Sequence, residues 1–308
     1  MRYVLYNILL LMLAPMGACY LVCSRRYRVL LRRFAPKIPS VPRGTILWVH
    51  GCSVGEVFVA SVLVRALREH DPEATTLLTV NTVSGYQLAK ETLSDISVTF
   101  APFDLAFCVR QFIKRVRPAM LVLLETELWP GLVRESRRQN IPVVVVNGRI
   151  SPRKFPNYKK YACILPPVFT WLSHVAAQEA VYRDRFVALG VSPDNITLTG
   201  NIKYDGVRTE VSECLKRSMR EENGFDEGHD ILVFGSTRPG DEVLAAECWQ
   251  CLKDAYPNLC FIIAPRHLNR LKEGVAAFKG EQVTLRSEIK AGKNPAKTRV
   301  LFLDSLGE

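Results

Sequence analysis

A single carboxylate stands out beside the first strand pattern of the chain. Glu56 is the first acidic residue of the sequence, and it directly follows the small-residue run GCSVG at residues 51–55. A carboxylate at the carboxyl end of a parallel strand can act as a general base. The glycine at each end of the run leaves space for a bulky substrate to approach. These residues therefore suggest proton abstraction from a bound substrate by Glu56.

The same run supports two other interpretations. Ser53 and Glu56 have the spacing of a capping box, in which each side chain binds a backbone N–H at the start of a helix. Residues 51–55 also match G-x-S-x-G, the nucleophile elbow of α/β-hydrolases, with His267 as a later histidine. That second pattern predicts a membrane-anchored serine hydrolase that uses Ser53. It is weakened because no upstream strand and loop are left to supply an oxyanion N–H.

Two more acids, Glu125 and Glu127, follow another strand pattern in the sequence LLETELWPG at residues 123–131. If this segment is extended, residues two apart point to the same side. Two carboxylates that close would raise the pKa of one of them, or would bind a cationic or hydroxyl-rich group. Solvated acids at the end of a strand are the alternative.

Groups suited to an anionic ligand follow the later strand patterns. The segment FGSTRPGDE at residues 234–242 is a glycine-bearing turn between a strand and a helix, where N–H and hydroxyl groups can bind a phosphate. The segments VNGRIS, GNIKYD and APRH add amide and cationic groups at other strand ends. The residues of interest are Asn147, Arg149, Lys203, Ser236, Thr237, Arg266 and His267. Together with the carboxylates, they suggest an anionic activated donor and a hydroxyl acceptor.

The elements that must position these residues form two doubly wound α/β domains. Apolar strand patterns alternate with amphipathic helical patterns, which is typical of parallel sheets covered on both faces. Ligands of such folds bind at the carboxyl ends of the strands. The predicted strands of the first half are residues 45–50, 75–80, 96–102, 119–125, 141–147, 174–178 and 196–201. Those of the second half are residues 230–236, 259–265, 282–287 and 299–304.

The N-terminus carries a predicted membrane anchor. Tyr3 to Cys23 form a run of 21 residues without a charge, about the length that crosses a hydrocarbon core. A cleaved signal peptide is the alternative, but the arginines follow the apolar run, which reverses the charge order of a signal peptide. The positive-inside rule then predicts a single-pass anchor with cytoplasmic domains. We divide the chain into a membrane anchor (1–24), a basic linker (25–43) and two Rossmann-like domains (44–204 and 205–308).

The charge distribution argues against nucleic acid as a partner. Eight of the 41 lysines and arginines and none of the 30 acidic residues lie in the first 55 residues, so most of the net charge of +11 is at the membrane end. This segment would bind anionic lipids, at on the order of 1 kcal/mol for each arginine. The nine cysteines are an odd number with a lone C-x-x-C pair, Cys248 and Cys251. They indicate a reducing compartment and no metal site.

Taken together, six segments resemble the Kdo transferases, the 3-deoxy-D-manno-octulosonic acid transferases of lipopolysaccharide assembly. The segments are HGCSVGEV, ETELWP, VNGRIS, GNIKYD, GSTRPGDE and APRH, in this order along nearly the whole chain. The resemblance implies a B-type (GT-B) glycosyltransferase with two Rossmann-like domains, anchored at the cytoplasmic face of the cell inner membrane. It also implies a metal-independent, inverting transfer without a cofactor, from CMP-Kdo to the lipid A precursor lipid IVA.

The resemblance further implies roles for individual residues. Glu56 matches the general base of the family, whereas Glu125 and Glu127 fall in its second acidic motif, with Glu127 favoured. The residues that would bind the acceptor are Ser53, Gly55, Asn147 and Arg149. Those that would bind the donor are Ser236, Thr237, Arg266, His267 and Lys203.

The resemblance is incomplete at the end of the sequence. In the family, the second domain continues into a glycine-rich segment and a donor loop similar to HNxxEP, and this sequence ends at Glu308. We therefore expect the 308-residue form to bind CMP-Kdo poorly and to transfer little Kdo. A shortened, non-catalytic paralogue stays open as an alternative, as does the serine hydrolase. The motifs do not predict how many Kdo residues are added or by which linkage.

Overall fold

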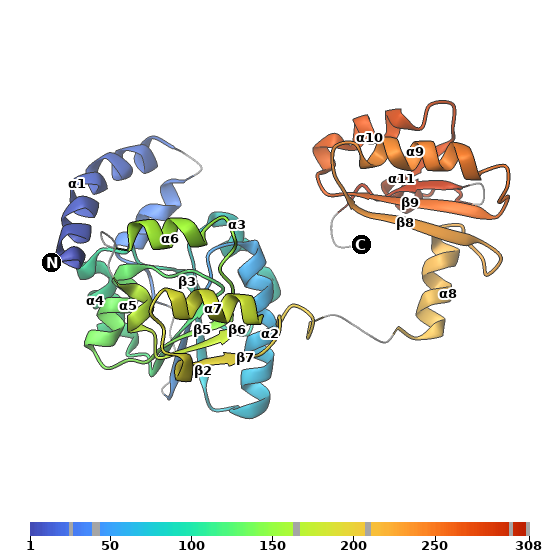
Figure 1. Ribbon diagram of the computed structural model, residues 1–308. Helices are drawn as coiled ribbons and strands as arrows, with labels where there is room; N and C mark the ends of the chain where they lie inside the picture. Colours follow the sequence, from blue (N-terminus) through green and yellow to red (C-terminus); the bar gives the residue numbers. More distant parts are fainter. Residues whose placement is uncertain (25–26, 39–43, 163–166, 207–210, 296–297, 306–308) are drawn as a thin grey trace. The chain divides into compact units, whose positions relative to one another are not determined.

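The chain folds into two compact units, each built on one parallel sheet (Figure 1). Unit 1 comprises Met1–Val207 and unit 2 comprises Arg208–Glu308. The computed structural model describes residues 1–308 except 25–26, 39–43, 163–166, 207–210, 296–297 and 306–308. Parts of the predicted basic linker therefore lie outside the described residues.

Unit 1 contains a seven-stranded parallel sheet with the order β3-β2-β1-β4-β5-β6-β7. The central strand β1 pairs with β2 on one side and with β4 on the other, so the direction of winding reverses between β1 and β4. Such a reversal opens a crevice at the carboxyl ends of the two strands. The strands are β1 Ile46–His50, β2 Thr75–Val80, β3 Ser97–Phe100, β4 Met120–Leu124, β5 Val143–Gly148, β6 His174–Ala177 and β7 Ile196–Leu198.

Helices cover both faces of this sheet, as the near-continuous apolar strands predict. On β1, Trp48 packs with the core formed by α4, α5 and α7, whereas the next residue, Val49, packs with the core formed by α2 and α3. The helices are α2 Val54–His70, α3 Val83–Thr92, α4 Ala106–Val116, α5 Pro130–Arg138, α6 Phe155–Tyr161 and α7 Ala180–Ala188. Unit 1 also contains the 3-10 helices η1 Arg28–Phe34, η2 Val168–Trp171 and η3 Pro193–Asn195.

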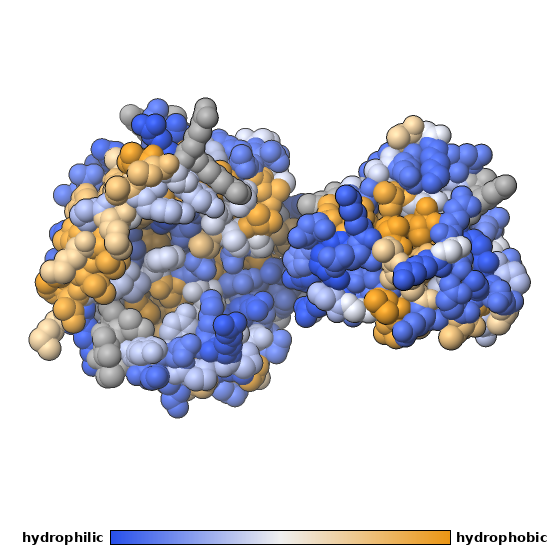
Figure 2. Space-filling view, turned by 90° about the horizontal axis from the view of Figure 1, so that it is seen from above, coloured by the Kyte–Doolittle hydropathy of each residue, from blue (hydrophilic) through white to orange (hydrophobic). Residues whose placement is uncertain are grey.

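Helix α1, Arg2–Cys23, is long and apolar enough to cross a membrane by length and composition. Its hydrophobic side chains are largely exposed, and they gather at the left of Figure 2. The first turns of α1 nevertheless contact the rest of unit 1 through polar groups. The Tyr3 hydroxyl donates to Glu135 at 3.0 Å, and the backbone N–H of Ala106 donates to Asn7 at 2.9 Å. The N-terminal end of α1 is therefore attached to the domain.

Asp104 connects α1 to the start of α5. One carboxylate oxygen accepts from the Tyr6 hydroxyl at 2.8 Å and from the Gly131 N–H at 2.7 Å, and the other accepts from the Leu132 N–H at 2.8 Å. The carboxylate thus satisfies donors at the N-terminus of α5, where a negative charge is favourable. Gly131 is required here because a Cβ atom would lie 2.4 Å from the Asp104 carbonyl oxygen.

Unit 2 contains a four-stranded parallel sheet with the order β10-β11-β9-β8. Trp249, Phe261 and Phe302 form its main core. The strands are β8 Asp230–Thr237, β9 Leu259–Pro265, β10 Val283–Leu285 and β11 Val300–Phe302. The helices are α8 Glu213–Glu222, α9 Asp241–Leu252, α10 Leu271–Ala277 and α11 Arg286–Lys290, with the 3-10 helix η4 at Leu268–Arg270. The parallel sheet of unit 2 confirms a second α/β domain, and each predicted strand is present in part; β7 is shorter than predicted, Glu125 lies beyond β4, and Arg286 and Ser287 belong to α11.

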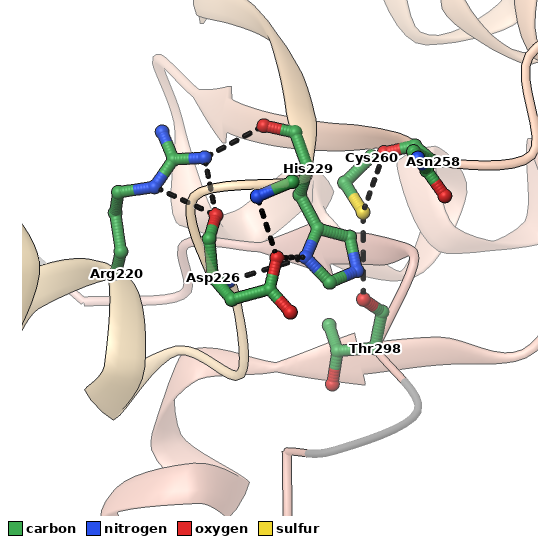
Figure 3. A network of polar contacts seen from close by, with 7 residues as sticks. Arg220, Asp226, His229, Asn258, Cys260 and Thr298 are labelled. Carbon is green, nitrogen blue, oxygen red and sulfur yellow. Dashed lines mark hydrogen bonds and ion pairs between the residues drawn. The ribbon is translucent and has the colours of Figure 1, made fainter.

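A polar network fixes α8 at the start of β8 (Figure 3). The Arg220 guanidinium donates to the carbonyl oxygens of Asp226 and His229, each at 2.6 Å. The Asp226 carboxylate in turn contacts His229 Nδ1 at 2.8 Å and accepts from the Gly228 N–H at 2.8 Å. These contacts close the turn between the helix and the strand, so we assign the network a structural role.

The stability of unit 1 should depend on pH through Asp104. Burial raises the pKa of this carboxyl from its ordinary value of 3.8 to about 6. The folded chain therefore holds the proton more tightly, so the stabilising contribution is complete below about pH 4 and is lost as the pH rises through about 6. The loss is at most about 3 kcal/mol. When the free energy of unfolding is measured by urea titration between about pH 4 and pH 6, Asp104→Asn should make it less dependent on pH. The same pH dependence in the wild type and the variant would show that Asp104 is not the group responsible.

Candidate active site

Glu56 lies in the first turn of α2, directly after the carboxyl end of β1. Its Oε2 atom accepts from the Ser53 N–H at 2.7 Å and from the Ser53 hydroxyl, so the predicted capping box is present. Gly51 allows this fold-back because a Cβ atom there would lie 2.8 Å from the Cβ of Glu56. By contrast, an added Cβ at Gly55 would meet no atom within 4 Å. The exposed Gly55 is therefore not required by the packing of the protein itself.

Glu125 and Glu127 occupy different environments. Strand β4 ends at Leu124, and Glu125 has a left-handed backbone with a φ of 56°, so the extended geometry assumed for this segment is wrong. The Glu125 carboxylate accepts from the Lys203 ammonium at 2.9 Å. The Glu127 carboxylate accepts from the Trp129 indole N–H at 3.1 Å. Only Glu125 is therefore neutralised by a close cation among the described ion pairs.

The thiol of Cys52 lies where the influences of Glu56 and Glu127 meet. Burial, together with the negative charges of Glu127 and Glu56, raises the pKa of Cys52 to about 11. The Asn81 amide donates to the sulfur at 3.4 Å and opposes this effect. The charges of Glu56 and Glu127 thus both affect the Cys52 thiol, as expected where the carboxyl ends of β1 and β4 lie next to each other.

A cavity of about 420 Å³ adjoins Glu127. Its wall combines apolar side chains, including Trp129 and Phe169, with the polar groups of Glu127, Lys154 and Tyr158. Burial and the charge of Glu127 raise the pKa of Tyr158. This volume is within the range of small-molecule sites. Lys154 and Tyr158 were not predicted from the sequence, because α6 and its N-cap residue Lys154 have no recognisable motif.

Asn147 and Lys203 meet Glu125 at the same edge of the sheet. Asn147 is buried, with a left-handed backbone at a φ of 58°, and its Oδ1 atom accepts from the Ile202 N–H at 3.2 Å. Its Nδ2 atom has no hydrogen-bond partner within the described part of the chain. Arg149 is exposed, and its carbonyl oxygen accepts from the Thr126 hydroxyl. These contacts hold the segment after β7 against the ends of β4 and β5.

The predicted anion-binding residues of unit 2 gather at the carboxyl ends of β8 and β9. Ser236 is exposed, with a φ of 57° at an irregularity of the β8–β9 pairing. The Thr237 hydroxyl donates to Glu242 at 2.8 Å, and the Thr237 carbonyl accepts from the Arg266 N–H at 3.1 Å. His267 follows as the N-cap residue of η4. Exposed Ser236, Arg266 and His267 can therefore contact a ligand, whereas the Thr237 hydroxyl is occupied.

The proximity of Cys52 to Glu127 can be measured by alkylation. Removing one negative charge with Glu127→Gln should lower the pKa of Cys52 and speed its reaction with iodoacetamide at pH 8 by roughly threefold to tenfold. Glu125→Gln is the matched control, because Glu125 is paired with Lys203. Mass spectrometry of peptides separates Cys52 from the other thiols. Equal rates in the two variants would show that Glu127 does not face Cys52.

Comparison with known proteins identifies the family. A family model described as 3-deoxy-D-manno-octulosonic-acid transferase (kdotransferase) matches residues 26–206. The 3-deoxy-D-manno-octulosonic acid transferase of Haemophilus influenzae is 31% identical over 313 residues, which cover 98% of this chain and 72% of the relative. That of Chlamydophila psittaci is 30% identical and covers 82% of this chain and 58% of the relative. The chain thus spans between about half and three quarters of the length of these relatives.

Solved structures agree on the fold. A UDP-GlcNAc 2-epimerase from Neisseria meningitidis has a TM-score of 0.59 at 11% identity, covering 86% of this chain and 73% of that structure. A glycosyltransferase from Rickettsia africae has a TM-score of 0.54 at 12% identity, covering 85% and 68%. At such low identity, these likenesses show the GT-B fold alone. The family model and the sequence identity show that the chain belongs to the 3-deoxy-D-manno-octulosonic acid transferase family of glycosyltransferases.

Proposed function

We propose that the protein transfers Kdo from CMP-Kdo to the lipid A precursor lipid IVA, with inversion and with Glu56 as the general base. Membership of the family supports the transfer of Kdo. The observation that carries the finer proposal is that Glu56 and Glu127 follow the paired strands β1 and β4, and that the charges of both raise the pKa of Cys52. Carboxylates at such a position suit an acceptor hydroxyl.

In the proposed reaction, Glu56 removes the proton from a primary hydroxyl of the acceptor. The hydroxyl oxygen forms a bond to the anomeric carbon of Kdo while the bond from that carbon to the phosphate oxygen breaks. CMP leaves with the bonding electron pair, and the proton stays on Glu56. The contacts described for Glu56 use Oε2, so its other carboxylate oxygen can receive the proton without loss of the capping box.

Glu127 would position the acceptor rather than the donor. The Trp129 indole N–H orients its carboxylate, and the adjoining cavity offers both apolar and polar walls. An acceptor that joins a sugar hydroxyl to a lipid needs such a mixed surface. We propose that Glu125 with Lys203, and Asn147 with the segment after β7, support the shape of this edge. Direct contacts to the acceptor would then come from Gly55, Ser53 and Arg149.

Unit 2 would bind the cytidine phosphate of the donor. Ser236, Arg266 and His267 are exposed at the ends of β8 and β9, and Ser236 is the second-last residue of β8, before the turn into α9. Backbone N–H groups and cations at such a turn suit a phosphate. Lys203 is a weaker candidate for the donor, because its ammonium already pairs with Glu125.

The contacts of Ser53 disfavour the alternative of a serine hydrolase. A nucleophilic serine needs a histidine base within hydrogen-bond reach. The hydroxyl of Ser53 instead donates to Glu56. The buried His50 contacts Thr79 at 3.0 Å, and burial lowers its pKa to about 3. Neither contact resembles an activated nucleophile.

The proposed function is tested by the mass of lipid IVA after incubation with CMP-Kdo and the full-length protein. We expect the acceptor to gain one or more Kdo masses, and Glu56→Gln to lower the rate by about 10²- to 10⁴-fold. Ser53→Ala, which removes a hydroxyl proposed to contact the acceptor, should mainly raise KM for lipid IVA, and loss of the cap should lower stability by about 0.5–2 kcal/mol. Full activity of Glu56→Gln would show that Glu56 has only a structural role, as part of the capping box of α2. A wild type that adds no Kdo but hydrolyses an ester, with hydrolysis lost in Ser53→Ala, would support the hydrolase instead.

We propose that the protein attaches to the cytoplasmic face of the inner membrane through α1, with its N-terminus on the same side as unit 1. The Arg2 guanidinium donates to the Ala162 carbonyl at 3.0 Å, and Tyr3 and Tyr6 donate to unit 1. After α1, the Arg33 guanidinium donates to the Ala101 carbonyl at 3.1 Å. A single-pass crossing would separate one end of α1 from these partners.

This topology predicts the accessibility of an N-terminal epitope. In inside-out vesicles of the inner membrane, added protease should remove the epitope and also reach an epitope placed in unit 2. In right-side-out spheroplasts, neither epitope should be cut. Removal of the N-terminal epitope alone from spheroplasts would establish a single-pass anchor and contradict the proposal.

A further inference from the structure

A groove lies between α1 and the rest of unit 1, and it is distinct from the cavity beside Glu127. It has a volume of about 420 Å³ and is mostly apolar. One face of α1 forms the first wall, with Leu10, Ala14, Gly17 and Leu21 at helical spacing. The opposite wall includes the rings of Phe34 and Phe103.

The groove is held open by contacts on both sides. The first turns of α1 are attached to unit 1 through Tyr6 and Asp104. On the opposite wall, the rings of Phe34 and Phe103 pack with their centroids 4.4 Å apart, and the Arg33 guanidinium lies 4.7 Å from the Phe103 ring. The two charged side chains of the lining are thus engaged with protein groups. The space that remains suits an uncharged, apolar ligand.

Gly17 keeps this space free. An added Cβ atom there would meet nothing within 4 Å, and its backbone has ordinary helical geometry. A glycine inside a helix lowers helix stability relative to alanine. Neither a tight contact nor a turn in the described structure accounts for the glycine. Space for a ligand beside α1 would account for the absence of a side chain at Gly17.

The groove is next to the candidate acceptor site. Tyr6 and Trp129 line both the groove and the cavity beside Glu127. Trp129 also donates its indole N–H to Glu127. On its other side, α1 exposes large apolar residues such as Met12 and Met16, which are 72% and 68% exposed. The groove therefore lies between a surface suited to a membrane and the cavity beside Glu127.

We propose that this groove binds one acyl chain of the lipid acceptor and so directs its sugar toward Glu56 and Glu127. The inference rests on the proposed function, because it names a part of the same acceptor site. The bilayer supplies the acyl chain along α1, and the chain ends near Trp129, where the polar part of the site begins. A second copy of α1 is the competing occupant.

The test compares Gly17→Leu, which fills the groove, with Met16→Leu, which changes the exposed face of the same helix. With tetraacylated lipid IVA and CMP-Kdo, Gly17→Leu in the full-length protein should raise KM by about tenfold. With the fully deacylated acceptor, both variants should match the wild type. An unchanged KM for lipid IVA, or the same rise with both acceptors, would overturn the inference.

A direct binding measurement separates failure of the groove from failure of the proposed function. A brominated medium-chain fatty acid should quench the fluorescence of Trp129, identified by subtraction with Trp129→Phe. The quenching should weaken in Gly17→Leu and persist in Met16→Leu. If the wild type transfers no Kdo to either acceptor but shows this pattern, the proposed function fails and the groove stands. Equal quenching in all variants would reject the acyl chain as the occupant. Chemical cross-linking that finds dimers of the wild type and of Met16→Leu but not of Gly17→Leu would also reject it, because a second copy of α1 would then occupy the groove.

Discussion

The reversal of strand order between β1 and β4 is the constraint on which the candidate active site depends. Strand β1 lies at the centre of the unit 1 sheet, with β2 on one side and β4 on the other. The loops that follow β1 and β4 leave adjacent strands in opposite directions, so a crevice forms between them. Glu56 and Glu127 come from these two loops and both act on the Cys52 thiol. Two carboxylates far apart in sequence thereby influence the same thiol.

Asp104 links this arrangement to helix α1. It is almost fully buried, and it binds the Tyr6 hydroxyl of α1 and the first N–H groups of α5 with one carboxylate. The segment from Glu127 to Trp129 directly precedes α5. A change in the attachment of α1 can therefore reach Glu127 through a short chain of polar contacts. The buried carboxylate is costly by itself, and its three donors offset that cost.

Much of the fold follows from sequence patterns, whereas the details of the site do not. Apolar strands and amphipathic helices predicted both parallel sheets and the edge at which their ligands would bind. The capping box of Glu56 was also predictable, because it depends on residues three apart. The partners of Glu125 and Glu127 were not, because a left-handed backbone at Glu125 ends the alternation of the strand. The Glu125–Lys203 pair joins distant segments, which no local pattern reveals.

The most direct test of a shared site is a double-mutant cycle on Kdo transfer with Glu56→Gln and Glu127→Gln. Residues that act as one unit in catalysis have strongly non-additive effects on kcat/KM. If both carboxylates serve the same acceptor hydroxyl, the double variant should be only slightly slower than the slower single variant. If the two losses multiply, Glu56 and Glu127 act independently, and the proposed site at the ends of β1 and β4 would be contradicted.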